Sequence, residues 1–96
     1  MARQLPQTQP GSDPQVRALT DLGTLVRNAR AHSRLRIDDA ASFIGVSADL
    51  LSRLENGKPV TTERLLKVLD GLGLDLLVVP RSQTLAMRDA VQKASE

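Results

Sequence analysis

The chain of 96 residues contains no cysteine, no tryptophan and no tyrosine, and Phe43 is its single aromatic residue. Without cysteine there is neither a disulfide framework nor a cysteine-based metal site, which suits a reducing cytoplasm. No apolar run approaches the ~20 residues that a membrane span requires, and no signal sequence opens the chain. We therefore expect a cytoplasmic protein of one small domain, with a core built from Leu, Val, Ile and Ala.

Side chains that support catalysis are equally scarce. His32 is the only histidine, so the sequence offers no cluster of metal ligands and no nucleophile with an adjacent base. We expect a non-enzymatic protein without a metal or another cofactor.

The net charge of +2 is small, but positive charge is concentrated between residues 16 and 37. This stretch contains Arg17, Arg27, Arg30, Arg34 and Arg36 against the one acidic residue Asp21. A local basic surface favours nucleic acid as a partner. A solvated helix face gives the same pattern, so charge alone does not decide between the two.

The segment from Arg36 to Lys58 has the pattern of two short amphipathic helices joined by a tight turn. Gly45 follows the last apolar position of the first helix, where a left-handed stop is common, and Ser47 is a favourable N-cap for the second. The expected packing residues are Ala40, Ala41 and Ile44 in the first helix and Leu50, Leu51 and Leu54 in the second. This is the layout of a DNA-binding helix-turn-helix.

Helical periodicity continues on both sides of this segment. Before it, Thr20 is the expected cap of a helix with the apolar stripe Leu22, Leu25, Val26 and Ala29. After it, Thr61 or Thr62 caps a helix that buries Leu65, Leu66, Leu69 and Leu72. We predict a flexible arm over residues 1–15, the helix-turn-helix domain over 16–73, a strand over 74–80 and a tail over 81–96.

The strand is predicted because the pattern changes after the last helix. Residues 74–80 are short, apolar and β-branched, and they end at Pro80. A lone strand needs a partner for its backbone, and the chain has no evident second one. The simplest partner is the same strand of a second copy, so Leu74, Leu76, Leu77, Val78 and Val79 are expected to pair across a homodimer. The alternative is an extended segment packed on its own core.

Three motifs resemble the Cro/repressor-like (Xre) family of bacterial and phage regulators. They are Leu22–Arg30 (LGTLVRNAR), the pair Gly45-Val46-Ser47 and Glu55-Asn56-Gly57-Lys58, and Arg64–Leu74 (RLLKVLDGLGL). The resemblance implies an all-α, lambda-repressor-like domain of four to five helices, with the C-terminal strand added. It also implies double-stranded operator DNA as the partner.

In such a domain the second helix of the motif lies in the major groove. The resemblance then places these residues at the bases: Ser47, Ala48, Asp49, Ser52 and Arg53. Arg53 is the best candidate for specificity, because its guanidinium can bond guanine O6 and N7 together, worth ~1–3 kcal/mol of discrimination. Asp49 has a second interpretation as a first-turn anion that never touches DNA.

Phosphate contacts are expected from Arg27, Arg36, Asn56 and Lys58. Many relatives bind a phosphate through a glutamine at the place of Ile37, so Arg36 would have to supply that contact here. In relatives the residues matching Arg30 and Glu55 form a partly buried salt bridge, which implies a structural role for this pair.

Within the family, the chain most resembles the Hip-type antitoxins, which join the same helices to a dimerising C-terminal strand. That resemblance implies a repressor of its own operon that also binds a kinase-fold toxin. The alternative is a stand-alone Xre or phage-type regulator with no toxin partner.

Overall fold

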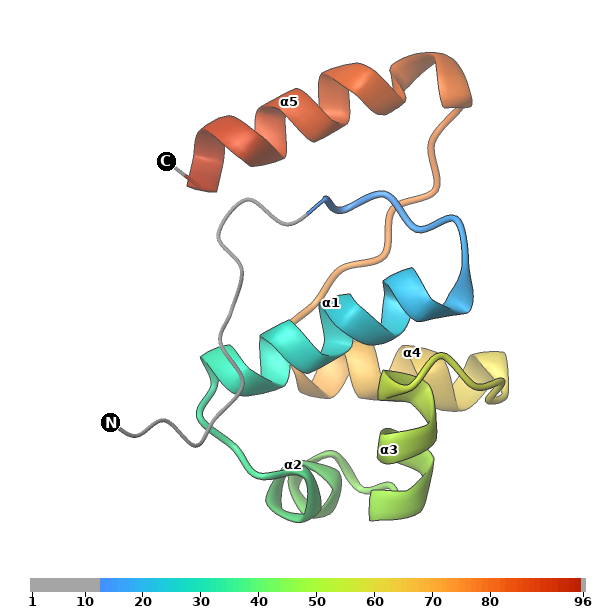
Figure 1. The fold of residues 1–96 in the computed structure, drawn as a ribbon, viewed down its shortest axis with the longest axis vertical. Coiled ribbons are helices and arrows are strands. Elements are labelled where there is room, and N and C mark those ends of the chain that lie inside the picture. Colours follow the sequence, from blue (N-terminus) through green and yellow to red (C-terminus); the bar gives the residue numbers. More distant parts are fainter. Residues whose placement is uncertain (1–12, 96) are drawn as a thin grey trace.

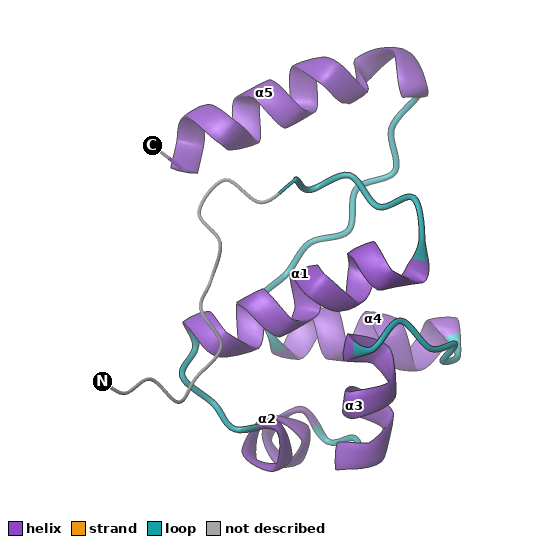
Figure 2. Ribbon diagram, viewed as in Figure 1, coloured by secondary structure: helices purple, strands orange, loops and turns teal. Residues whose placement is uncertain are grey.

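The computed structural model describes residues 13–95, and this range is built from helices (Figure 1). The elements in chain order are α1 (Leu19–His32), α2 (Ile37–Ile44), α3 (Ala48–Glu55), α4 (Thr62–Gly71), the short 3-10 helix η1 (Arg81–Gln83) and α5 (Thr84–Ser95). No β-strand forms within these described residues (Figure 2). The expected all-α class of four to five helices is confirmed for this range, which has five α-helices.

The turn between α2 and α3 forms as its residue types predict. Gly45 has φ of 94°, in the left-handed region that favours glycine, and its N–H donates to the Ala41 carbonyl at 2.8 Å. Ser47 then caps α3, because its Oγ accepts the Leu50 N–H at 3.0 Å. One helix therefore ends and the next begins within three residues, which sets the sharp angle of a helix-turn-helix.

A single core lies between α1, α2, α3 and α4. Its largest fully buried side chains are Val26, Leu51, Leu54 and Val68, joined by Ala40, Ala41 and Ile44 of α2. Full burial of one Leu or Val side chain stabilises a fold by ~1.5–3 kcal/mol. The apolar side of α3 is thus fixed in the core, and its other side faces outward.

Two details of the flanking helices differ from the prediction. In α4, Leu66 is 48% exposed and Val68 is fully buried, because the buried stripe passes through Val68 rather than Leu66. At the start of α1, Thr20 is not the cap. The helix begins at Leu19 after the N-cap residue Ala18, and the Asp21 carboxylate reaches back to accept the N–H groups of Arg17 at 2.9 Å and Ala18 at 3.0 Å.

The predicted strand over residues 74–80 does not form in the single chain. The segment carries no regular secondary structure and runs from α4 past α1 to η1 (Figures 1 and 2). Leu77 is 65% and Val78 is 90% exposed. A strand is defined by hydrogen bonds to a neighbouring strand, and residues 13–95 of one chain provide none.

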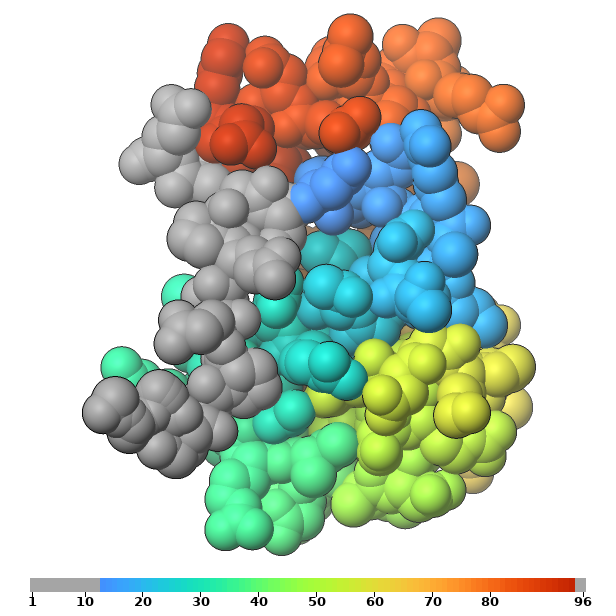
Figure 3. Space-filling view, in the orientation of Figure 1, coloured from blue at the N-terminus to red at the C-terminus, as the bar shows by residue number. Residues whose placement is uncertain are grey.

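The tail predicted over residues 81–96 is helical through η1 and α5. Figure 3 shows α5 set apart from the body formed by α1–α4, with the chain that leads into α1 between them. An ion pair joins the two sides, with Arg88 Nη2 2.9 Å from Asp13 Oδ2. The predicted flexible arm over residues 1–15 lies largely outside the described residues.

Candidate nucleic-acid interface

The outer side of α3 presents the polar residues that the sequence singled out. Ser47, Ala48, Asp49 and Arg53 are exposed, and Ser52 is half-buried. They lie on one short helix whose opposite side, Leu51 and Leu54, is in the core. An α-helix of this kind fits the width of a DNA major groove, and its outer side chains can then face base edges.

Arg53 is oriented by the loop that follows α3. Its Nη2 donates to the Pro59 carbonyl at 3.2 Å, six residues further along the chain. Arginine has five N–H donors, so this bond leaves others for a second acceptor. The Arg53 side chain is therefore held at Nη2 by the Pro59 carbonyl and still has the N–H donors that hydrogen bonds to a guanine require.

Arg30 and Glu55 form the buried ion pair of the domain. Nε of Arg30 lies 2.6 Å from Glu55 Oε2, and Nη2 donates to Oε1 at 2.9 Å, a bidentate pair with both residues buried. The hydrogen bond to Glu55 raises the pKa of Arg30 above its ordinary value, against the opposing effect of burial. Arg30 Nη1 also donates to the Leu35 carbonyl at 3.0 Å. One guanidinium thus connects α1, the end of α3 and the chain leading into α2.

Arg27, expected at a phosphate, lies against the C-terminal end of α3. Its Nε is 3.5 Å from Glu55 Oε1, and its Nη2 donates to the Glu55 carbonyl and to Asn56 Oδ1, both at 3.4 Å. The side chain remains 43% exposed. Arg27 therefore makes contacts within the chain that were not predicted from the sequence. Only the exposed part of its side chain is accessible to a DNA phosphate.

The other three expected phosphate ligands lie around the ends of α2 and α3. Asn56 donates through Nδ2 to the Ser52 carbonyl at 2.8 Å, which fixes its amide. Lys58 is exposed after α3. Arg36, the N-cap residue of α2, lies 3.7 Å from Asp38 in an open pair with the two side chains 79% and 64% exposed. Open pairs of this kind stabilise little and leave the cation available.

Gly23 allows α1 to lie directly on the end of α3. A Cβ added at Gly23 would be 2.5 Å from the Glu55 carbonyl oxygen and 2.7 Å from that of Leu54. Only a residue without a side chain permits this approach. This packing role of Gly23 was not predicted, and the available clue was a glycine inside a helix, away from any turn or helix end.

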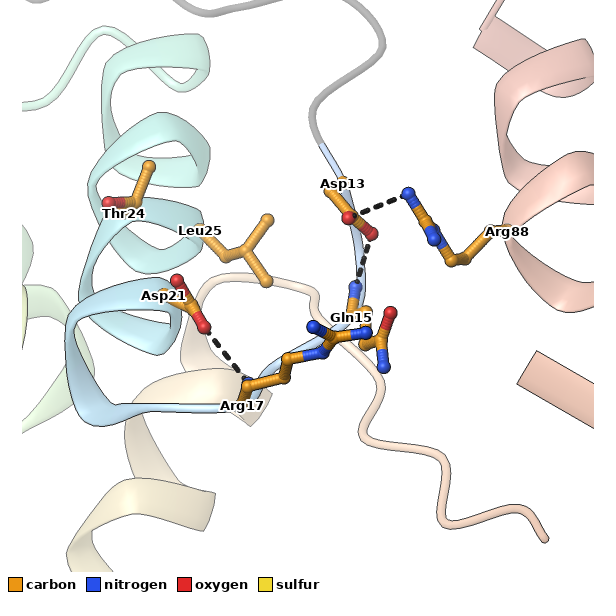
Figure 4. Close-up of a pocket in the computed structure, with 7 residues that line it drawn as sticks. All are labelled: Asp13, Gln15, Arg17, Asp21, Thr24, Leu25 and Arg88. Atoms are coloured by element: carbon orange, nitrogen blue, oxygen red, sulfur yellow. Dashed lines mark hydrogen bonds and ion pairs between the residues drawn. The ribbon is translucent and has the colours of Figure 1, made fainter. Parts of the chain in front are cut away.

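A cleft of about 400 Å³ lies on the other side of the body, between α1, α5 and the chain entering α1. Figure 4 shows the residues that line it: Asp13, Gln15, Arg17, Asp21, Thr24, Leu25 and Arg88. Asp13 forms an ion pair with Arg88, and the Asp21 carboxylate accepts the backbone N–H of Arg17. This cleft is separate from α3.

Within the part of the chain that the structure describes, no group of three or more His, Asp or Glu side chains is placed to hold a metal ion. None of the helices described is long and apolar enough to cross a membrane.

Residues 21–81 match the family model for a helix-turn-helix domain. The chain belongs to this family. The match extends from α1 through α4 to the start of η1, so it covers all four helices around the core and the segment 74–80. No curated protein matches the chain.

The family match confirms the coarse part of the sequence interpretation. The helix-turn-helix protein is Xre-like, and its domain type is that of DNA-binding regulators, which are typically non-enzymatic. The match does not distinguish Hip-type antitoxins from other members.

Proposed function

We propose that this helix-turn-helix protein is a sequence-specific transcriptional repressor that inserts α3 into the major groove of an operator. The observation that carries the proposal is the division of α3 into two sides. Leu51, Leu54 and Glu55 hold the inner side in the core and in the ion pair with Arg30, whereas Ala48, Asp49 and Arg53 on the outer side are exposed. A recognition helix needs this combination of a fixed orientation and accessible side chains.

In this proposal the outer residues Ser47, Ala48, Asp49, Ser52 and Arg53 face the bases, and Arg53 contributes most of the discrimination. Arg36, Asn56, Lys58 and the exposed part of Arg27 contact phosphates. Phosphate contacts fix the register of the protein on DNA, whereas base contacts select the sequence.

The test is selection of bound duplexes from a random library, followed by binding measurements on the selected operator. Arg53→Ala should lose preference at one base position, by about 5- to 150-fold for a loss of ~1–3 kcal/mol, with binding to unrelated DNA nearly unchanged. The matched control is Arg81→Ala, an exposed arginine outside the helix-turn-helix. A uniform loss on every sequence would make Arg53 a phosphate ligand, and no enrichment of any sequence would contradict the proposal.

We further propose that residues 74–80 pair antiparallel with the same segment of a second copy. Within residues 13–95, the backbone of residues 75–79 forms no backbone–backbone hydrogen bond, although Leu76, Leu77 and Val78 are all more than half exposed. Open backbone groups next to exposed apolar side chains favour addition of a strand. A homodimer would also match the two half-sites typical of such operators.

Finally, we propose that the protein is the antitoxin of a toxin–antitoxin pair, autoregulating its operon and binding a kinase-fold toxin. The support is the resemblance to Hip-type antitoxins, together with the exposed apolar residues of segment 74–80 and of α5, where Leu85 is 76% exposed. Purification of the tagged protein from its native host tests this. A stoichiometric kinase-fold partner supports the antitoxin role. Homodimer and DNA alone, while a toxin-like neighbour is expressed, indicate a stand-alone regulator.

A further inference from the structure

Arg34 holds an unfavourable backbone conformation between α1 and α2. Its φ is 60°, and it is the one non-glycine residue with a positive φ in the described range. The left-handed region is disfavoured for L-residues with an ordinary side chain, and glycine adopts it without this cost. A position that favours glycine therefore carries one of the largest side chains.

The surrounding structure enforces this conformation. The Arg34 N–H donates to the Ala31 carbonyl at 3.0 Å, and the Leu35 N–H donates to the Arg30 carbonyl at 3.3 Å. The Leu35 carbonyl in turn accepts from Nη1 of the buried Arg30. Arg34 is thus fixed from both sides, and strained residues that persist in this way are concentrated at functional sites.

The Arg34 side chain is available for a ligand. Arg34 is exposed, and its guanidinium makes no ion pair or hydrogen bond with any residue between 13 and 95. Arg36, two residues further on and at most ~7 Å away along the backbone, is also exposed and only loosely paired with Asp38. Two exposed guanidinium groups therefore precede the first turn of α2.

We propose that Arg34 is a DNA phosphate ligand that acts together with Arg36, and that its left-handed backbone is retained because the side chain is needed. This inference rests on the proposed function, since the phosphates are those of the duplex that α3 reads. Because the turn that carries Arg34 is rigid, little conformational entropy is lost when the guanidinium binds a phosphate. The left-handed backbone at Arg34 lowers the stability of the fold, and the charged side chain that it carries raises the affinity for DNA.

The experiment compares Arg34→Gly and Arg34→Asn, which are neutral and suited to a left-handed backbone, with Arg34→Lys, which keeps the charge. The probe is a 30-bp duplex of mixed sequence, because a phosphate contact is independent of sequence. The glycine variant should melt about 4 °C higher than wild type. Both neutral variants should bind about 3- to 10-fold more weakly, with the salt slope smaller by ~1 per subunit.

Arg34→Lys should keep the salt slope and melt like wild type, and Arg81→Gln controls for the loss of one positive charge elsewhere. Neutral Arg34 variants that bind like wild type overturn this inference while leaving the proposed function intact. A glycine variant that is no more stable than wild type overturns the trade between stability and affinity. A wild-type protein that binds no duplex overturns both proposals.

Discussion

Replacement of Gly23 by alanine tests whether the position of α3 depends on direct contact between backbones. The new Cβ would lie 2.5 Å from the Glu55 carbonyl oxygen, 0.9 Å inside the 3.4 Å at which ordinary contact begins. The obstacle is backbone of α3, so a side-chain rotation cannot relieve it, and α1 and α3 must separate. Overpacking of this kind costs ~1–3 kcal/mol, and the gain in helix propensity returns up to ~1 kcal/mol. We expect a net loss of about 1–2 kcal/mol.

Thermal and urea unfolding followed by circular dichroism measure this loss, which should lower the melting temperature by roughly 4–16 °C. Thr24→Ala is the matched control, because it places alanine on the exposed side of the same helix, and it should change stability by less than ~0.5 kcal/mol. The separation of α1 and α3 also moves Glu55 away from Arg30. Binding to the selected operator should therefore weaken even at temperatures below the melting transition, where the variant is folded. A Gly23→Ala protein as stable as wild type would refute the packing argument.

Three further perturbations follow from the same contacts. Glu55→Gln leaves the buried Arg30 without its anion and should cost ~3–5 kcal/mol in chemical unfolding. Because the pKa of Arg30 is raised above its ordinary value, Arg30 stays protonated throughout the neutral range, and the loss should therefore not change with pH in that range. Leu77→Pro removes a backbone donor from the proposed interface and should give a monomer by light scattering, so a persistent dimer would exclude this interface. With about six phosphate contacts, affinity for the operator should fall ~10³-fold between 50 and 200 mM salt, and a flat response would count against DNA as the main ligand.

Local rules were sufficient to predict the helix-turn-helix itself. Gly45 and Ser47 have the residue types that end one helix and begin the next, and the structure places both in those roles. The buried positions of α2 and α3 likewise follow the apolar spacing in the sequence. At the start of α1, however, the predicted cap Thr20 lies inside the helix, the N-cap residue is Ala18, and the Asp21 carboxylate accepts the N–H groups of Arg17 and Ala18.

Features that depend on contacts between distant segments were less predictable. The sequence does not indicate which segment Gly23 meets, or that Arg27 bonds to Asn56, because these contacts follow from how α1 crosses α3. The strand over residues 74–80 depends on a partner for its backbone, so apolar β-branched composition alone could not produce it in one chain. The DNA-contacting roles of individual residues remain predictions.

The division of α3 into two sides also bears on how operator preference can change in evolution. Substitutions of exposed residues such as Ala48 and Asp49 are expected to alter stability by no more than ~0.5 kcal/mol, because these residues are exposed and are not part of the core cluster. The orientation of the helix is set elsewhere, by Arg30, Glu55 and Gly23. New sequence preferences can therefore be explored one residue at a time, without the compensating mutations that a change in a packed surface demands. Paralogues with the same body and different operators are the expected outcome of this arrangement.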